Sequence, residues 1–274
     1  MAASVAQGSR TFFPHEHGAT AMLLTPFFCA AVLLKRLYWA EGVILIAIAC
    51  AFAIKDPLVV VARQVWIWKQ EHPETKAAKR WIGAELILLS LCGLALLGTR
   101  NWRSFVLLSL GAAAFTLVAV MVNLQNRQRS EWFQVASAVV LTSTSLAAGL
   151  SAQGVIPSWC WVLWLLCALQ ATAGIFVVHA RLDARVAVRK GGAETGSRRA
   201  ASLCQVILLA ASCFFVYERR PWIAAALLMA AAGYLFELRR QRKTASLKMP
   251  LTRVGKQALT LSAVYSVLII IGLW

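Results

Sequence analysis

The sequence predicts an all-α fold, a polytopic membrane bundle of about nine transmembrane helices in a single domain covering residues 1–274. Hydrophobic residues make up 60% of the chain and charged residues 14%, whereas a soluble domain carries roughly 25% charged residues. Apolar runs of about 20 residues, the length that crosses the hydrocarbon core as a helix, recur throughout. Basic residues gather between these runs, as they do in the loops of membrane proteins.

The first three predicted spans cover residues 18–34, 42–62 and 82–98. A pair of basic residues closes the first. The second is interrupted by Lys55-Asp56-Pro57, because the proline removes a helical hydrogen bond and two charges stand at membrane depth. A polar, helical loop leads to the third span, which carries a carboxylate in its first turn.

The next three predicted spans cover residues 104–124, 132–150 and 159–178. A short link before the fourth span makes the third and fourth an antiparallel pair. The fifth is rich in Ser, Thr, Ala and Gly, so we expect it to pack closely against its neighbours. The sixth opens with three tryptophans, which is typical of a membrane interface.

The last three predicted spans cover residues 201–217, 222–238 and 257–274, so that the two chain ends lie on opposite sides of the membrane. Of the 28 Lys and Arg residues, 21 fall on the side of the N-terminus and six on the other, with Lys55 inside a span. Because basic loops stay in the cytoplasm, this split predicts a cytoplasmic N-terminus and an external Trp274.

Composition also excludes several classes of function. Topology and anionic lipid account for the net charge of +17, so we expect the lipid bilayer as partner and no nucleic acid. The N-terminal residues lack a short apolar core with a cleavage site, which argues against a signal peptide. The seven cysteines are scattered in apolar runs without metal or redox spacing, as small buried hydrophobic residues are.

The two aspartates, Asp56 and Asp183, lie at the cytoplasmic ends of the second and sixth spans and are the tentative catalytic residues. Asp56 shares a helix face with Arg63, and Asp183 shares one with His179, so each carboxylate stands among cations. Charge pairing at the interface is the alternative explanation. Charged residues inside a membrane span usually have a function, so Lys55 and Asp56 rank first among the candidate site residues.

Candidate ligand-binding residues gather at one cytoplasmic mouth, formed by the start of the first span and the ends of the second, fourth and sixth. They are His15, His17, Lys55, Arg63, Asn123, Arg127, Arg129, His179, Arg181 and Arg185. A metal centre needs three or four convergent ligands, so we assign no metal ligand to the histidine pair, for which capping of the first span is the alternative role.

Three segments carry a family resemblance: PHEHGATAMLLTPF, VVHARLDARVAVRKG and RVGKQALTLSAVYSVL. They are similar to the YwiC-like family of bacterial membrane proteins, whose members open with the pattern Pro-x-x-His-Gly-Ala-x-Ala-Met. The resemblance runs nearly end to end and implies a multi-pass protein of the bacterial inner (plasma) membrane. The family has no settled activity to carry over.

The layout also resembles the UbiA superfamily of intramembrane prenyltransferases, which place Asp-rich motifs after their second and sixth spans to hold magnesium against a prenyl diphosphate. Here KDPLVVVAR retains only Asp56 and HARLDARVAVRK only Asp183. Lys, Arg and His stand around them, and such side chains bind a diphosphate directly but do not cage magnesium. The case for magnesium as a cofactor is therefore weaker, and no cofactor is assigned. Whether the chain is an enzyme stays open.

Two functions remain. In the first, a cytoplasm-facing cavity binds an isoprenoid or lipid-like anion, with prenyl transfer as a divergent activity. In the second, the chain is a non-enzymatic transporter or accessory membrane protein that uses the broken helix at Lys55-Asp56-Pro57. No protein partner is assigned.

Overall fold

The computed structural model describes residues 17–36, 38–70, 72–98, 102–190 and 196–274. All regular structure in these ranges is helical, which confirms the predicted all-α class. The elements are α1 (His17–Leu33), α2 (Trp39–Ala53), α3 (Lys55–Ala62), the π-helical turn η1 (Arg63–Trp68), α4 (Glu74–Leu97), α5 (Trp102–Leu124), α6 (Glu131–Thr142), α7 (Thr144–Gln153), α8 (Ser158–Lys190), α9 (Ser197–Tyr217), α10 (Pro221–Arg240), α11 (Thr244–Leu247) and α12 (Leu251–Leu273).

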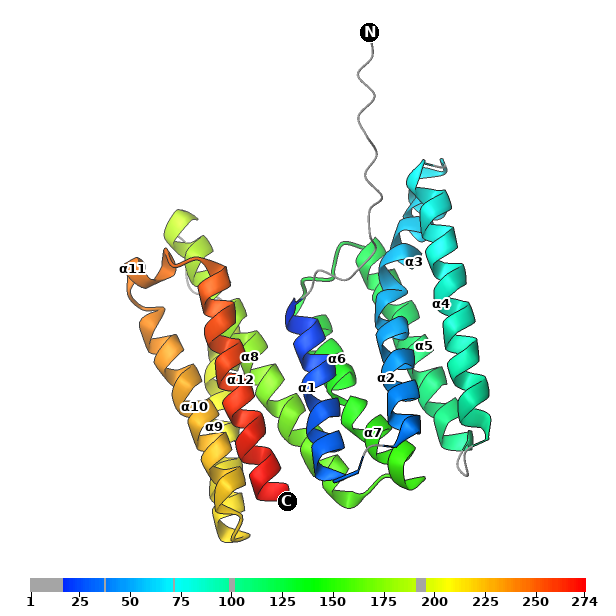
Figure 1. The fold of residues 1–274 in the computed structure, drawn as a ribbon. Helices are drawn as coiled ribbons and strands as arrows, with labels where there is room; N and C mark the ends of the chain where they lie inside the picture. The colour runs from blue at the N-terminus through cyan, green and yellow to red at the C-terminus, as the bar shows by residue number, and fades with distance from the viewer. Residues whose placement is uncertain (1–16, 37, 71, 99–101, 191–195) are drawn as a thin grey trace.

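Within the described part of the chain, eight helical segments are long and apolar enough to cross a membrane. They are α2 with α3 and η1, α4, α5, α6 with α7, α8, α9, α10 and α12, while the apolar part of α1, Gly18–Leu33, is shorter. Successive segments run in opposite directions, so α1 begins at one end of the bundle and α12 finishes at the other (Figure 1). The chain is a multi-pass membrane protein. We call the end where α1 begins and α8 ends the basic end, because its loops carry most of the Lys and Arg.

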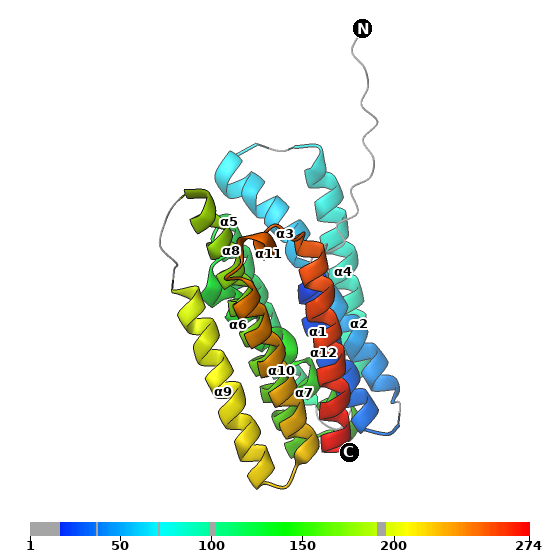
Figure 2. The ribbon, with the colours of Figure 1, turned by 90° about the vertical axis from the view of Figure 1, so that its left-hand side faces the viewer.

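The helices form two groups with a central set between them. The first group is α8, α9, α10 and α12, the second is α2 to α5, and α1, α6 and α7 lie between them (Figures 1 and 2). The main cluster of buried apolar side chains draws most heavily on α8 and α10. Small residues allow the close approach, since Ala226, Ala230 and Ala231 of α10 all have 0% exposure.

One span of the second group and one of the central set are interrupted in mid-span, and α1 of the central set contains a proline. Pro26 lies inside α1, and a turn at Ile54 separates α2 from α3, just before Pro57. A turn at Ser143 separates α6 from α7, where the Thr142 hydroxyl donates to the carbonyl of Ala138 at 2.8 Å. Hydroxyl groups that bond to nearby carbonyls compete with the helical ladder, which explains an interruption without proline.

Candidate ligand-binding cavity

A cavity of about 1370 Å³ lies among the helices of the second group and the central set. Met22 of α1, Ile54 between α2 and α3, and Ser143 between α6 and α7 all line it, together with residues of α4 and α5. Pockets for drug-sized ligands measure about 300–1,000 Å³, so this cavity suits a larger occupant.

Most of the cavity wall is apolar. Several lining residues carry a hydroxyl group that is bonded within its own helix. Ser90 donates to the carbonyl of Leu86 at 2.8 Å, and Thr116 donates to that of Ala112 at 2.9 Å. Ser137 likewise donates to its own helix. Because these hydroxyls are engaged by backbone carbonyls one turn earlier, they present little polarity to an occupant.

The charged and amide side chains of the lining gather toward the basic end. They are Lys55 of α3, Asn123 of α5, Gln128 and Arg129 of the α5–α6 loop, and Gln134 of α6. Lys55, Asn123 and Arg129 are among the residues predicted from the sequence. The cavity is therefore polar and cationic from the interruption at Ile54 to the basic end, and apolar beyond it.

Lys55 belongs to a group of charges at the interruption between α2 and α3. Its Nζ lies 3.7 Å from Asp56 Oδ1 and 5.6 Å from the centre of the Phe52 ring. Glu85 of α4 is buried and interacts electrostatically with Asp56. Glu85 was not among the predicted site residues, although a carboxylate inside a span is the signal that singles it out.

Arg63 and Asn123 meet at the basic end of the cavity. The Nη2 group of Arg63 donates to the Asn123 carbonyl at 3.2 Å, to Asn123 Oδ1 at 3.0 Å and to Asn126 Oδ1 at 3.3 Å. These bonds hold the start of η1 against the end of α5. Asn123 lines the cavity and Arg63 does not, while Arg127 is exposed on the α5–α6 loop outside the lining.

His179 and Asp183 of α8 stand behind the cavity wall rather than in it. The Nε2 of His179 lies 2.9 Å from Oε1 of Gln134, which lines the cavity, and its Nδ1 lies 3.9 Å from Glu131 Oε1. The Ser197 hydroxyl bridges Glu131 and Asp183, with Asp183 Oδ2 at 2.5 Å. Asp56 and Asp183 thus belong to separate networks.

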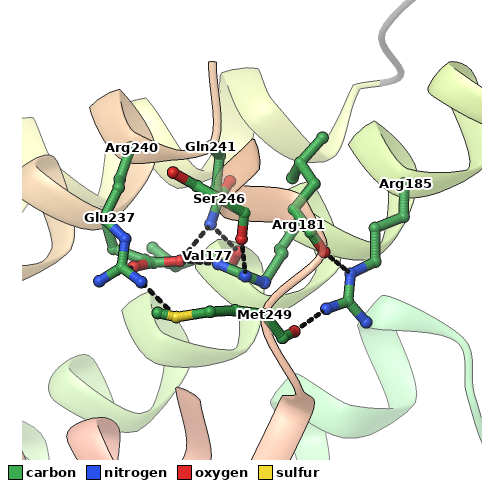
Figure 3. A network of polar contacts seen from close by, with 9 residues as sticks. Val177, Arg181, Arg185, Glu237, Arg240, Gln241, Ser246 and Met249 are labelled. Carbon is green, nitrogen blue, oxygen red and sulfur yellow. Dashed lines mark hydrogen bonds and ion pairs between the residues drawn. The ribbon is translucent and has the colours of Figure 1, made fainter. Parts of the chain in front are cut away.

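Arg181 and Arg185 belong to a third network, at the end of α8 (Figure 3). The Arg181 side chain is 0% exposed, pairs with Glu237 of α10 and donates to the Ser246 carbonyl at 2.5 Å. Arg185 donates to the carbonyls of Leu247, at 2.8 Å, and Met249. We call these contacts the α8 clamp, because they fasten the α10–α12 connector to α8.

Gln241 reinforces the α8 clamp by donating to the Val177 carbonyl at 3.1 Å (Figure 3). The remaining predicted residue pair cannot be placed in any network. His15 lies outside the described residues, and His17 begins α1 with a side chain that is also outside them.

The described side chains do not fit a magnesium centre. No group of three or more His, Cys, Asp or Glu residues in the described ranges is arranged to hold a metal ion. Asp56 of α3 pairs with Lys55, whereas Asp183 of α8 accepts a hydrogen bond from Ser197 of α9. The two carboxylates that the UbiA resemblance would assign to magnesium therefore do not converge.

Comparison with known proteins gives a family and no further relative. The sequence model of the YwiC-like protein family matches residues 13–149, which is half of the 274-residue chain. No curated protein matches, and no solved structure matches. The matched segment contains every residue of the cavity lining except Ile175. The chain belongs to the YwiC-like protein family.

Proposed function

We propose that this YwiC-like membrane protein binds an isoprenoid or lipid-like anion in the cavity among α1 to α7, with the basic end facing the cytoplasm of a bacterial cell. The observation that carries the proposal is the combination of a long apolar wall with cations only from the interruption at Ile54 to the basic end. A ligand with an apolar tail and an anionic headgroup has the complementary distribution.

Lys55 and Arg129 supply the charge that such a headgroup needs. An ammonium group and a guanidinium group both bind phosphate oxygens by charge-assisted hydrogen bonds, and the guanidinium does so with two parallel bonds. The amides of Asn123, Gln128 and Gln134 line the same cavity and add neutral donors. The excess of basic residues at this end supports its cytoplasmic orientation.

Prenyl transfer on a UbiA-like scaffold is the finer form of this proposal. Asp56 is the carboxylate beside the cationic end of the cavity, at 3.7 Å from Lys55. Asp183 does not line the cavity and accepts a hydrogen bond from Ser197, whose hydroxyl also contacts Glu131, so its part is to hold Glu131 in place through Ser197. No step of this proposal depends on a metal ion.

The binding proposal is tested by thermal unfolding of the protein, purified in mild detergent, with prenyl phosphates and diphosphates added. We expect stabilisation of the wild type, and a loss of affinity of roughly ten- to hundred-fold in Lys55→Gln and in Arg129→Gln, because a hydrogen bond to a charged group is worth about 1.5–3 kcal/mol. Arg103→Gln removes an exposed cation near the start of α5, outside the lining, and serves as the matched control. No stabilisation by any prenyl anion, or equal losses in all three variants, would contradict the proposal.

A transporter is the second candidate, favoured by the charge group at the interruption between α2 and α3. Interrupted helices that carry ionisable side chains at membrane depth line the binding sites of many secondary transporters. Asp56 would be the coupling residue. Flux of protons or anions into proteoliposomes that is abolished by Asp56→Asn supports this function, whereas flux that is absent or unaffected by the change rejects it.

A further inference from the structure

We infer that the occupant of the cavity carries a tail about as long as the whole hydrocarbon core is thick, and that Phe105 and Leu96 at the far end limit the length of that tail. The ligand class is then a long linear isoprenoid-type anion rather than a phospholipid with ordinary acyl chains. This inference rests on the proposed function and adds the size class of the ligand.

The depth of the cavity follows from α5, which runs along it. Asn123 at the polar end and Phe105 at the far end both line the cavity and lie 18 positions apart on this helix. Because an α-helix rises about 1.5 Å per residue, the lining extends over about 27 Å. A bilayer has a hydrocarbon core about 30 Å thick, so each leaflet supplies about 15 Å.

Buried apolar side chains close the far end. Ile44 of α2, Leu96 of α4 and Phe105 of α5 are 7%, 6% and 7% exposed and belong to the main apolar cluster of the bundle. A tail that enters from the polar end therefore meets a floor built from three helices.

Depth and floor together select a long tail. An acyl chain that fills one leaflet reaches only about half of the 27 Å depth. The wall beyond its end would then contribute no dispersion energy to the binding of that ligand. A tail of nearly twice that length contacts the wall down to Phe105.

The cavity is also open on the side that faces lipid. Leu107 and Leu117 of α5 and Val140 of α6 line it, although they are 72%, 63% and 36% exposed. α5 packs chiefly against α3, and α6 packs against α8 and α1, so the cavity wall is incomplete between α5 and α6. Near the basic end the rings of Phe115 and Phe133 stack across this opening, with centroids 6.2 Å apart. A long tail can therefore pass sideways from the bilayer.

Gly111 offers a way to shorten the cavity without disturbing the helix. It lines the cavity between Phe105 and Asn123, and it shares a helix face with Leu108 and Phe115. A β-carbon placed there meets no atom within 4 Å. Because Gly is a poor helix former, Gly111→Leu adds bulk to the cavity while favouring α5.

The test measures the rise in unfolding temperature of the full chain in mild detergent across a series of prenyl monophosphates of increasing tail length, with phosphatidic acid of ordinary acyl length for comparison. We expect the rise to grow with tail length, to reach a maximum and then to fall, and to exceed that given by phosphatidic acid. Gly111→Leu should move the maximum to shorter tails, and Phe105→Ala should move it to longer ones. Phe214→Ala, which removes an exposed ring on α9 outside the lining, should leave it in place.

The possible outcomes separate this inference from the function on which it rests. A rise that is independent of tail length, or a maximum that neither cavity variant moves, overturns the length limit while leaving anion binding intact. If no phosphate of any tail length raises the unfolding temperature, the proposed function itself fails. Each protein is compared with its own unliganded form, so a loss of basal stability in Phe105→Ala does not obscure the result.

Discussion

The two groups of helices lie in the same membrane but are packed differently. The first group is α8, α9, α10 and α12, and the second is α2 to α5. In the most apolar stretch of α8, 50% of the residues are buried, and in that of α10, 44% are. The corresponding value is 17% for both α4 and α5, and the other members lie between these extremes, with 28% for α9, 22% for α12 and 28% for α2 with α3 and η1. The closely packed group also holds the α8 clamp, whereas the loosely packed group borders the cavity.

This difference suggests a division of roles. Helices in lipid associate through close packing and polar contacts, since the lipid tails are as apolar as the side chains. The first group has both kinds of contact, and its stability should not depend on a ligand. The second group has a cavity where such contacts would be, so an occupant should supply part of its cohesion. The YwiC-like match, residues 13–149, covers the second group and the central set, and so defines the family by the part that borders the cavity.

The largest effect is expected at the α8 clamp. Arg181→Ala leaves the Glu237 carboxylate without its buried partner, although Arg240 stays 3.8 Å away, and should lower the free energy of unfolding by about 3 kcal/mol, the low end of the usual range. Thermal unfolding of purified protein measures the loss, with Arg63→Ala, whose partners are neutral amides, as the control. The double change Arg181→Met with Glu237→Leu should recover most of it. A smaller loss of stability for Arg181→Ala than for Arg63→Ala would contradict the view that the first group is held together more strongly than the second.

Leucine truncation sharpens the comparison. Leu227 of α10 is 0% exposed, so Leu227→Ala should cost about 2 kcal/mol, the low end of the usual range, because lipid rather than water surrounds the unpacked helices. Leu117 of α5 is 63% exposed, and Leu117→Ala should change stability by less than about 0.5 kcal/mol. The difference in unfolding temperature between the two variants is the measurement. Equal losses would mean that both groups are packed alike.

A methyl group added at a glycine should destabilise the protein in the first group of helices and stabilise it in the second. A β-carbon at Gly272 of α12 would lie 2.6 Å from Ile223 Cγ1 and 3.0 Å from the Ile223 nitrogen, which cannot move freely. Gly272→Ala should therefore destabilise by about 1–3 kcal/mol. Gly111→Ala enters open space and should stabilise by up to about 1 kcal/mol, through helix propensity. Stabilisation by both changes would show that the first group can accommodate a methyl group at Gly272 in spite of its burial.

A small effect is expected at the contact between Arg63 and Asn123, which holds the second group together. Asn123→Ala removes the Arg63 bond to the amide oxygen but keeps the bond to the backbone carbonyl, so the loss should be about 1 kcal/mol or less. Asn126→Ala, which removes a more exposed and longer bond, is the matched control. Thermal unfolding with and without a bound prenyl phosphate distinguishes the Asn123→Ala and Asn126→Ala variants. If the occupant bridges α3 and α5, bound ligand should reduce the loss of stability caused by Asn123→Ala.

The fold class was predictable because span length and apolar composition follow directly from the thickness of the bilayer. The interruption near Lys55-Asp56-Pro57 was predictable for a similar reason, since proline lacks the backbone donor. The interruption at Ser143 was not predicted. Its signal is the Thr-Ser-Thr-Ser run at residues 142–145, whose hydroxyls bond to the backbone instead of leaving it to the helical ladder.

The candidate site was harder to predict, because spacing along one helix does not say which neighbour that helix faces. Arg181 and Arg185 share a face of α8, as the four-residue spacing indicates, but the acceptors on that face are Glu237 and backbone carbonyls that lie 56 to 65 positions away. His179 and Asp183 point to α6 and α9 instead. One helix end therefore divides its polar residues between a structural clamp and the rear of the cavity.

The incomplete wall between α5 and α6 changes what affinity means for this protein. An occupant that passes sideways exchanges with the surrounding lipid and never needs to dissolve in water. Its occupancy is then governed by its mole fraction among the neighbouring lipids, and every bilayer or detergent molecule of similar shape competes for the same space. Two membranes with equal total amounts of ligand but different lipid dilution would load the protein to different extents.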